Sequence, residues 1–538
     1  MQYKQLVLLV LDGFGITSNT ESNPVLAASM RNLNFLINNY PSTTLQASGP
    51  SVGLPWGERG NSEVGHMNLG AGRIISQDLP RINASISGGT FFQNPALLAA
   101  VNHAKDNNSN LHLAGLVSSG GVHSSEEHLY AIMQMAANAG VSRVFIHMFT
   151  DGRDTHPKVA IESLDRLSRK ILEIGVGKIA TVGGRFYAMD RGGHFDLTES
   201  MYKAMVLGEG NNFPSALTAI RAYYDQQLTD EVLPPTVITD AGGAPIAKVA
   251  GGDSIIFFNF RSDRMKQIFH AFTVEKFDKF SKPYPHLDNV AVATMTLYDH
   301  DQVADAAFPP TEIKNGLSEV VSRANLRQFH IAESEKYAHV TYFFNGGREE
   351  PMQGEEREIV SSPAAYQKRY EDVPQMSVDL IGTTVVDKIQ KGINFILANV
   401  ANPDMVGHTG NRTACIEALK AVDKNIGVIF EAVMAAGACL VLTSDHGNIE
   451  ERYDPLTGEV SKEHSLNPVP LVVAGKGLEA KKVKSHGYVE LASVVPEGVL
   501  SDVSPTVLDL MGLPKPAEMT SISLMQAGLM DGTGGSNP

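Results

Sequence analysis

Continuous apolar runs recur along this chain, and several of them end at a short polar segment. Leu6–Leu11 leads directly to Asp12, and the run from 438 to 442 leads to Asp445 and His446. An apolar run without alternation is typical of a strand buried on both faces of a parallel sheet. Open α/β sheets bind ligands at the carboxyl ends of their strands. We therefore expect these polar residues at one sheet edge, although an Asp-His pair there is more often a hydrogen-bonded turn than a pair of metal ligands.

A glycine-rich segment follows a helical pattern at residues 23–39. It reads Gly60-Asn61-Ser62-Glu63-Val64-Gly65-His66, and its glycines allow the backbone to approach a ligand closely. The simpler interpretation makes Ser62 the N-cap of a helix. The alternative makes Ser62 a nucleophile, with helix N-terminal amides placed to receive a phosphoryl group.

Strand-like and helix-like segments alternate from about residue 77 to 310, which predicts βαβ units. The strands are expected at 111–117, 144–149, 178–182, 254–258 and 290–296. Arginines recur soon after these strands and could clamp an oxyanion bidentately, with a solvated charged rim as the alternative. They are Arg153, Arg185, Arg191, Arg261 and Arg264. Asp154 either carries a proton to and from a substrate hydroxyl or simply orients its neighbour Arg153.

The last third of the chain adds three candidate metal ligands. A strand expected at 394–399 leads to Asp404 and His408, whose i, i+4 spacing would let both reach one ion from a helical turn. A proline and a glycine within the segment favour a loop instead. His464 precedes a strand expected at 471–474 and on its own would be an ordinary polar surface residue.

The candidate ligands lie near both ends of the sequence, which predicts a discontinuous domain. If they share a site, the N-terminal segment joins a C-terminal sheet, and the region between them is an inserted second α/β domain. The expected domains are 1–76 with 311–530 for metal binding and 77–310 for substrate binding and phosphotransfer, followed by a flexible tail at 531–538. The strand series after 310 is expected to open at Tyr337–Phe344, directly after Lys336.

These residue types predict a site for two divalent ions. Three carboxylates, three imidazoles and one hydroxyl are enough ligands for two ions, and the mixture of oxygen and nitrogen suits manganese or zinc better than calcium or copper. Two such ions activate a serine hydroxyl and neutralise the charge that develops on phosphorus. The expected chemistry is therefore phosphoryl transfer.

The composition limits which classes of partner and which cellular compartment we expect. The net charge is −15, which argues against a general nucleic-acid-binding surface and favours a small-molecule substrate. No apolar run reaches the length of a membrane helix or has the form of a signal peptide. The two cysteines, Cys415 and Cys439, are expected to be buried and reduced. We expect a monomer in the cytoplasm with no membrane partner.

Seven motifs in this order closely resemble the cofactor-independent phosphoglycerate mutases of the alkaline phosphatase superfamily, and the resemblance covers nearly the whole chain. The motifs are Leu11-Asp12-Gly13, the segment Gly60 to His66, Asp151-Gly152-Arg153-Asp154, Phe260-Arg261-Ser262-Asp263-Arg264, Glu335 to Thr341, Asn402 to Gly410 and Ser444-Asp445-His446-Gly447-Asn448. The resemblance implies an alkaline-phosphatase-like metal domain with a second α/β domain inserted in it.

The resemblance also implies a role for each matching residue. One manganese ion would be held by Asp404, His408 and His464, and the other by Asp12, Ser62, Asp445 and His446. Ser62 would take the phosphoryl group from 3-phosphoglycerate and return it to the 2-hydroxyl, without bisphosphoglycerate. Asp154 would shuttle the proton and Lys336 would support the phosphoryl group. The substrate contacts would be His123, Arg153, Asp154, Arg185, Arg191, Arg261, Arg264 and Lys336.

Other functions are open at this point. A phosphomonoesterase, phosphodiesterase or another phosphomutase of the superfamily would share the metal ligands but not the arginine motifs. A catalytically inactive metal-binding module would be expected to lack a ligand or Ser62, and none is missing. An apparent insertion at 485–500 lies away from every motif.

Overall fold

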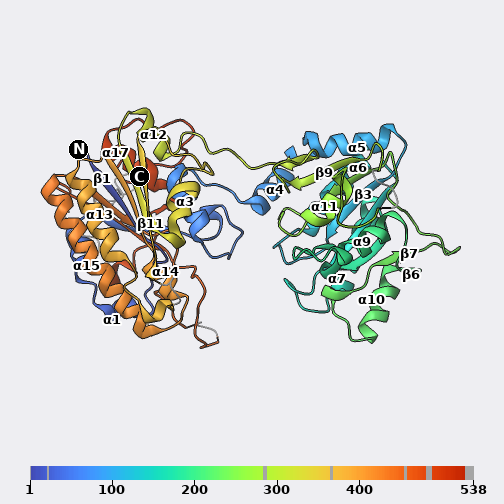
Figure 1. The fold of residues 1–538 in the computed structure, drawn as a ribbon, viewed down its shortest axis with the longest axis horizontal. Coiled ribbons are helices and arrows are strands. Elements are labelled where there is room, and N and C mark those ends of the chain that lie inside the picture. Colours follow the sequence, from blue (N-terminus) through green and yellow to red (C-terminus); the bar gives the residue numbers. More distant parts are fainter. Residues whose placement is uncertain are drawn as a thin grey trace, which may run out of the picture. The chain divides into compact units, whose positions relative to one another are not determined.

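The structure is a computed structural model that describes residues 2–20, 23–282, 287–363, 368–453, 457–479 and 487–526. The expected tail at 531–538 and the start of the expected insertion, residues 485 and 486, lie outside these ranges. The chain forms two compact units, which we call unit 1 (Met1–Gln77 with Glu312–Pro538) and unit 2 (Asp78–Thr311). Each unit has its own sheet (Figure 1).

The sheet of unit 1 brings the N-terminal strand between two C-terminal ones. Strand β1 (Leu6–Leu11) pairs in parallel with β13 on one side and β14 on the other. Strand β15 is antiparallel to its neighbours. The described strand order is β12 (Glu355–Val360), β11 (Gln328–Glu333), β13 (Phe395–Val400), β1, β14 (Cys439–Thr443), β15 (Val469–Gly475), β2 (Ser42–Gln46) and β16 (Gly498–Val499). Asp12 and Asp445 therefore follow adjacent strands of one sheet, as the sequence predicts.

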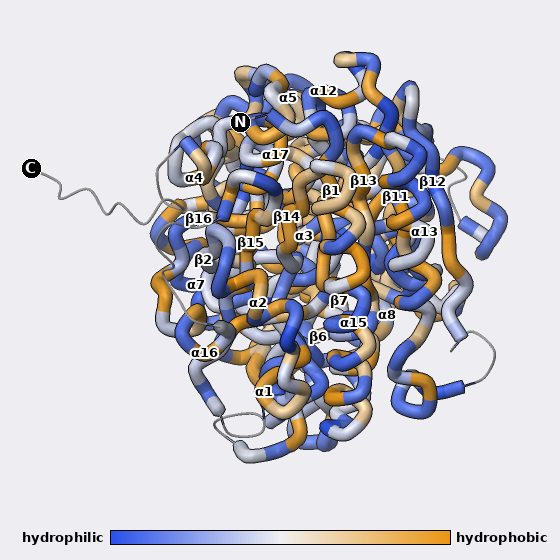
Figure 2. Tube along the Cα trace, turned by 90° about the vertical axis from the view of Figure 1, so that its left-hand side faces the viewer, coloured by the Kyte–Doolittle hydropathy of each residue, from blue (hydrophilic) through white to orange (hydrophobic). Residues whose placement is uncertain are grey.

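Both faces of this sheet are covered, which explains the continuous apolar strands. Val7, Leu9 and Leu11 of β1 pack into one core, and Leu6, Leu8 and Val10 pack into the other. Much of β14 and β15 is correspondingly hydrophobic in Figure 2. The first core includes helices α1 (Pro24–Ala28), α2 (Arg31–Asn39), α13 (Val378–Gln390) and α15 (Arg412–Ala436); the second includes α3 (Ser62–Ala71), α12 (Leu317–Arg323) and α17 (Val503–Met511). Burying each large apolar side chain contributes about 1.5–3 kcal/mol.

The prediction of a strand at Tyr337–Phe344 is wrong. The strand of this region is β11, and it leads into a 3₁₀ turn at Ser334–Lys336 and a short π-helical segment at His339–Phe343. Val340 and Phe344, one turn apart, are both buried in the second core of unit 1. The buried positions thus recur at helical rather than strand spacing, and the turn places Lys336 at the end of β11.

Unit 2 is a second α/β layer structure. Its described strand order is β10 (Asp305–Phe308), β9 (Ala291–Thr296), β8 (Ser254–Phe257), β3 (Leu111–Leu116), β4 (Val144–Thr150), β5 (Lys178–Gly184), β7 (Thr236–Ile238) and β6 (Asn211–Phe213). Only the pairing of β7 with β5 is antiparallel among these described strands. One face carries α4 (Asp78–Ser87), α5 (Pro95–Asp106), α6 (Glu126–Ala139), α7 (Ala160–Ile174) and α10 (Ala216–Asp225); the other carries α8 (Arg185–Ala188), α9 (Phe195–Val206) and α11 (Lys266–Thr273).

The predicted fold class, two α/β domains with the second inserted in the first, is confirmed. The five strands expected between 111 and 296 correspond to β3, β4, β5, β8 and β9. Cys415 and Cys439 are buried free thiols. Among the described residues, no helix combines the length and the hydropathy that crossing a membrane requires.

Candidate metal centre

Ser62 is the first residue of helix α3, and it does not cap that helix. The side chain of Asn61 caps it instead, because its Oδ1 accepts a hydrogen bond of 3.0 Å from the backbone N–H of Val64. The N-cap role expected for Ser62 is therefore wrong, and its hydroxyl is free to face the sheet edge. A Cβ atom on Gly65 would lie only 2.7 Å from the Asp445 carbonyl oxygen, so glycine is what lets α3 approach the loop after β14 this closely.

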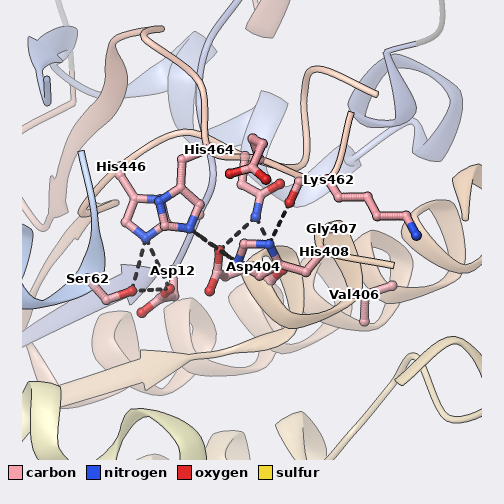
Figure 3. A network of polar contacts seen from close by, with 12 residues as sticks. Asp12, Ser62, Asp404, Val406, Gly407, His408, His446, Lys462 and His464 are labelled. Carbon is pink, nitrogen blue, oxygen red and sulfur yellow. Dashed lines mark hydrogen bonds and ion pairs between the residues drawn. The ribbon is translucent and has the colours of Figure 1, made fainter. Parts of the chain in front are cut away.

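One group of candidate ligands surrounds Ser62. The Ser62 hydroxyl donates to Oδ1 of Asp12 over 3.1 Å and lies 3.0 Å from Nε2 of His446 (Figure 3). Asp12, Asp445 and His446 each offer a ligand atom within 4.8 Å of the others, and all three are buried. They follow β1 and β14, so two neighbouring strand ends and the start of α3 build this group.

A second group lies beside the first. Nε2 of His408 and Nε2 of His464 are 3.2 Å and 3.3 Å from Oδ1 of Asp404. Asp404 belongs to helix α14 (Asn402–Gly407), so the loop expected here is wrong; Pro403 is accommodated because the first helical turn needs no N–H from it. The rings of His446 and His464 stack with centroids 3.9 Å apart, which brings the two groups into contact (Figure 3).

The three imidazoles share one hydrogen-bonding arrangement. In each ring Nδ1 lies against a backbone carbonyl and donates its proton to it, so Nε2 is the ring nitrogen that faces the carboxylates. The partners are Gly447 for His446 at 3.2 Å, Lys462 for His408 at 2.7 Å and Gly60 for His464 at 2.7 Å. A neutral imidazole held in this way is the form that ligates a metal ion.

Lys336 is the buried cation between the two groups. Its Nζ lies 2.6 Å from Oδ1 of Asp12, 2.6 Å from Oδ2 of Asp404 and 2.7 Å from the Ser62 hydroxyl. Burial acts to lower the pKa of Lys336, but the charges of Asp12 and Asp404 outweigh it, so its pKa is raised and the side chain is an ammonium. The same ammonium opposes burial at Asp404 and holds the pKa of that carboxyl well below its usual range.

In unit 2, Arg185 is the buried arginine of the predicted set. Its Nη1 donates to Oδ1 of Asp151 over 2.7 Å and to Oδ2 of Asp154 over 2.5 Å. His123 lies 3.7 Å from the same Asp154 oxygen. Burial, reinforced by the charge of Arg185, lowers the pKa of His123 to about 4, so this imidazole is neutral at physiological pH. The structure therefore brings Asp154 together with Arg185 and His123.

The remaining predicted arginines lie at the surface of unit 2. Arg191 and Arg261 both pair with Asp263, over 2.6 Å and 3.3 Å, and their side chains are 56% and 53% exposed. Arg153 pairs with Glu231 over 3.3 Å, so the described contacts do not show Asp154 orienting Arg153. Arg264 donates to the Met189 carbonyl oxygen over 3.4 Å, and burial, reinforced by the charges of Arg185 and Arg191, lowers its pKa. This is a loose cationic cluster around one buried arginine.

Two family models match the sequence. One, described as the N-terminus of BPG-independent PGAM, matches residues 82–300, and the other, described as type I phosphodiesterase / nucleotide pyrophosphatase, matches residues 264–465. Curated 2,3-bisphosphoglycerate-independent phosphoglycerate mutases are similar over almost the full length. The one from Moorella thermoacetica is 45% identical over 525 residues, covering 98% of this chain and 99% of the relative. The one from Clostridium perfringens strain 13 is 44% identical over 527 residues, covering 98% and 100%.

This chain belongs to the 2,3-bisphosphoglycerate-independent phosphoglycerate mutase family. A crystal structure of Leishmania mexicana phosphoglycerate mutase at low cobalt concentration agrees, with 28% identity and a TM-score of 0.61 over 97% of this chain and 98% of that one. The family resemblance read from the seven motifs is thereby confirmed.

The residues present in this family member fit divalent ions. Three buried carboxylates, those of Asp12, Asp404 and Asp445, face one buried ammonium, so the described site carries an uncompensated negative charge that a dication would neutralise. Oδ2 of Asp445 is buried and makes no hydrogen bond among the described residues. Together with three Nε2 lone pairs, these oxygens form a mixed donor set of the kind that borderline divalent ions prefer.

Sequence reasoning missed three polar residues that touch the predicted ligands. His66 and Asn399 contact the first group, and Asn448 donates over 2.8 Å to Oδ1 of Asp404 in the second. A signal existed for Asn399, because it interrupts the otherwise apolar strand β13 and is fully buried there. His66 lies four residues after Ser62, which places it on the same face of α3.

Proposed function

We propose that this protein interconverts 3-phosphoglycerate and 2-phosphoglycerate through a phosphoserine on Ser62, with two bound Mn²⁺ ions and without bisphosphoglycerate. Its place in the mutase family supports the reaction, and the two groups of buried ligands support two ions. The related Leishmania mexicana enzyme was crystallised with cobalt, a divalent ion of the same borderline class. The reaction would serve glycolysis and gluconeogenesis.

Each ligand group would hold one ion. We assign Asp404, His408 and His464 to one ion, and Asp12, Ser62, Asp445 and His446 to the other. When bound, such ions lower the pKa of a coordinated hydroxyl and neutralise charge on a phosphoryl group. The backbone carbonyls behind each imidazole would keep the rings in the ligating tautomer.

The placement of Ser62 is the observation that carries the proposal. Its hydroxyl stands at the N-terminus of α3, within 3.1 Å of Asp12, His446 and Lys336. The free N–H groups of the first helical turn favour an anion at this position. Ser62 Oγ would bond to phosphorus as the ester bond to the glycerate breaks, and Lys336 would pair with the phosphoryl oxygens.

Residues of unit 2 would bind the glycerate and move its proton. We assign the carboxylate and phosphate of the substrate to the cationic cluster of Arg153, Arg185, Arg191, Arg261 and Arg264, with His123 as a neutral hydrogen-bonding partner. Asp154 would give a proton to the departing glycerate oxygen and take one from the hydroxyl that attacks phosphoserine. Its carboxylate already contacts Nη1 of Arg185 over 2.5 Å and lies 3.7 Å from Nε2 of His123, so it stands among the proposed substrate contacts of unit 2.

The setting we propose is a cytoplasmic monomer with no nucleic-acid partner. All of the proposed ligands and substrate contacts come from one chain, so no second subunit is needed to complete the set. The free buried thiols of Cys415 and Cys439 suit a reducing compartment, and a net charge of −15 disfavours nucleic acid.

The test couples purified protein to enolase and follows 3-phosphoglycerate conversion with Mn²⁺ and no bisphosphoglycerate. We expect turnover that a chelator abolishes and Mn²⁺ restores. Activity only with added bisphosphoglycerate would overturn the proposal. Release of inorganic phosphate from 3-phosphoglycerate, without 2-phosphoglycerate, would favour a phosphomonoesterase instead.

A further inference from the structure

Asn399 and His66 form a chain of polar contacts beneath the first ligand group, hydrogen-bonded from Asp12 to the Ser62 carbonyl and ending at ion-pair distance from Asp445. Nδ2 of Asn399 lies 2.7 Å from Oδ2 of Asp12 and 3.0 Å from Nε2 of His66. Nδ1 of His66 then lies 2.9 Å from the Ser62 carbonyl oxygen and 3.2 Å from Oδ2 of Asp445. One chain of polar atoms thus runs from one carboxylate to the other and touches the peptide that carries Ser62.

The proton inventory fixes the direction of each contact. Nδ2 of Asn399 donates one amide hydrogen to Oδ2 of Asp12, and the second amide hydrogen is then directed at His66. Nε2 of His66 must therefore accept, which places its single proton on Nδ1. That N–H donates to the Ser62 carbonyl oxygen and lies against Asp445. The amide nitrogen of Asn399 and both ring nitrogens of His66 therefore contact each other, the candidate ligands or the Ser62 peptide.

Asn399 and His66 are both held by regular secondary structure. Asn399 sits within β13, in register with Val10 of β1, and His66 lies one turn into α3; both side chains are fully buried. Asn399 takes one oxygen of Asp12, which leaves the other facing Ser62, Lys336 and His446. Asp445 is held from its other side by the backbone N–H of Gly13 and its own neighbour's N–H, over 3.1 Å and 3.0 Å.

We propose that Asn399 and His66 are positioning residues: an amide–imidazole bridge that sets the site-facing oxygens of Asp12 and Asp445 relative to Ser62. The inference rests on the proposed function for its kinetic consequence, but its consequence for ion binding does not depend on the substrate. Partners that orient metal ligands in this way typically contribute about 10–100-fold to metal affinity or activity. Neither residue touches the reacting atoms.

The experiment compares Asn399→Leu and His66→Phe with a matched control, Asn68→Leu. Asn68 is also a buried asparagine of unit 1, on α3 itself, but its amide donates to the backbone carbonyls of Val52 and Val64, away from the ligands. Mn²⁺ binding is measured by calorimetry on the full-length chain, thermal unfolding is measured in chelator, and kcat and KM are measured in the enolase-coupled assay at saturating Mn²⁺.

We expect both bridge variants to weaken one of the two Mn²⁺ binding steps by about 10–100-fold and to lower kcat with KM unchanged. His66→Gln should restore most of the loss, because its amide offers an acceptor and a donor in place of the ring nitrogens. The double variant should lose no more than the worse single variant, since the residues act as one unit. Asn68→Leu should lower the unfolding temperature without changing Mn²⁺ affinity.

Unchanged Mn²⁺ affinity in both bridge variants would overturn the inference, as would additive losses in the double variant. A loss that Asn68→Leu reproduces would reduce the bridge to ordinary core packing and would overturn it as well. If Asn399→Leu does not fold, the inference is tested by comparing the Mn²⁺ affinities of His66→Phe and His66→Gln, and equal affinities would overturn it. A wild-type protein that binds Mn²⁺ but does not convert phosphoglycerate would refute the proposed function and leave the calorimetric comparison valid.

Discussion

Lys336→Met should separate the structural and catalytic roles of the buried ammonium. Lys336 is 4% exposed and pairs with Asp12 and Asp404, which are 0% and 4% exposed. Removing one partner of a buried ion pair costs about 3–5 kcal/mol, because the remaining charge stays buried without compensation. For a domain of this size about 2 °C of unfolding temperature corresponds to 1 kcal/mol, so the expected loss is roughly 6–10 °C in chelator.

The assay is thermal unfolding in chelator and again in saturating Mn²⁺ at pH 8. The folded-state pKa of Lys336 is raised, so its contribution to stability is complete at this pH and is lost only above its unfolded pKa of about 10.4. Bound ions would neutralise the same carboxylates, so Mn²⁺ should reduce the deficit. Turnover should stay low in Mn²⁺, with kcat reduced by about 10²–10³-fold, as for other lost donors to a transition-state anion.

The matched control is Lys391→Met, which removes an exposed lysine that pairs with Asp387 over 2.7 Å on helix α13. Such a surface pair contributes about 0.3–0.5 kcal/mol, so the unfolding temperature of Lys391→Met should differ from that of the wild type by about 1 °C. Equal small shifts for Lys336→Met and Lys391→Met would refute the reasoning. A Lys336→Met protein with near-normal turnover would refute the catalytic role.

Three further predictions concern other parts of the site and fold. Arg185→Met should lower kcat/KM by about 10–100-fold and leave Mn²⁺ binding intact, because the charge-assisted hydrogen bonds of Arg185 go to Asp151 and Asp154 of unit 2; weaker Mn²⁺ binding would contradict its assignment to substrate. Asn61→Ala should cost about 1 kcal/mol in urea unfolding and Asn61→Asp should not, and equal losses would count against the cap. Burial lowers the pKa of His112 and His147, so the unfolded chain binds more protons below about pH 6.5 and stability should fall from there as pH decreases. His147→Gln should flatten that fall in urea unfolding, and an unchanged slope would exclude this buried pair as its source.

Much of the fold could be predicted because its strands are buried on both faces. A fully apolar run such as Leu6–Leu11 has few alternatives in a chain of this length, and the polar residue after it marks the sheet edge. The candidate ligands could be found for the same reason. Asp12, Asp404 and Asp445 each follow such a run.

The segments that were misread carry competing local signals. Tyr337–Phe344 contains aromatic and β-branched residues that favour a strand, yet packing of Val340 and Phe344 against α3 and its neighbours gives a helical segment. Pro403 was read as a helix breaker, but it occupies the first turn of α14, where proline is well tolerated. In the first case tertiary packing outweighed the local strand propensity. In the second case the helix-breaking effect of proline was assigned to a position, the first helical turn, where it does not apply.

The residues that contact the candidate ligands could not be predicted from their spacing in the sequence. Asn399 lies 387 residues from Asp12 in sequence, and only the pairing of β1 with β13 brings their side chains together. His66 lies close to Ser62 in sequence, but its contact with Asp445 depends on the close approach of α3 at Gly65. Such contacts depend on the fold, so the sequence pattern indicates the candidate ligands, whereas the structure is needed to find the residues that orient them.

The most direct test of the central claim is to look for the phosphoryl group on Ser62. Protein incubated with 3-phosphoglycerate and Mn²⁺ is quenched in acid, digested and analysed by mass spectrometry. We expect one phosphoryl group on the peptide that contains Ser62, and we expect Ser62→Ala to lose both this modification and turnover while its unfolding temperature in chelator stays close to that of the wild type. Turnover retained by Ser62→Ala, or a phosphoryl group found on another residue during turnover, would contradict the account.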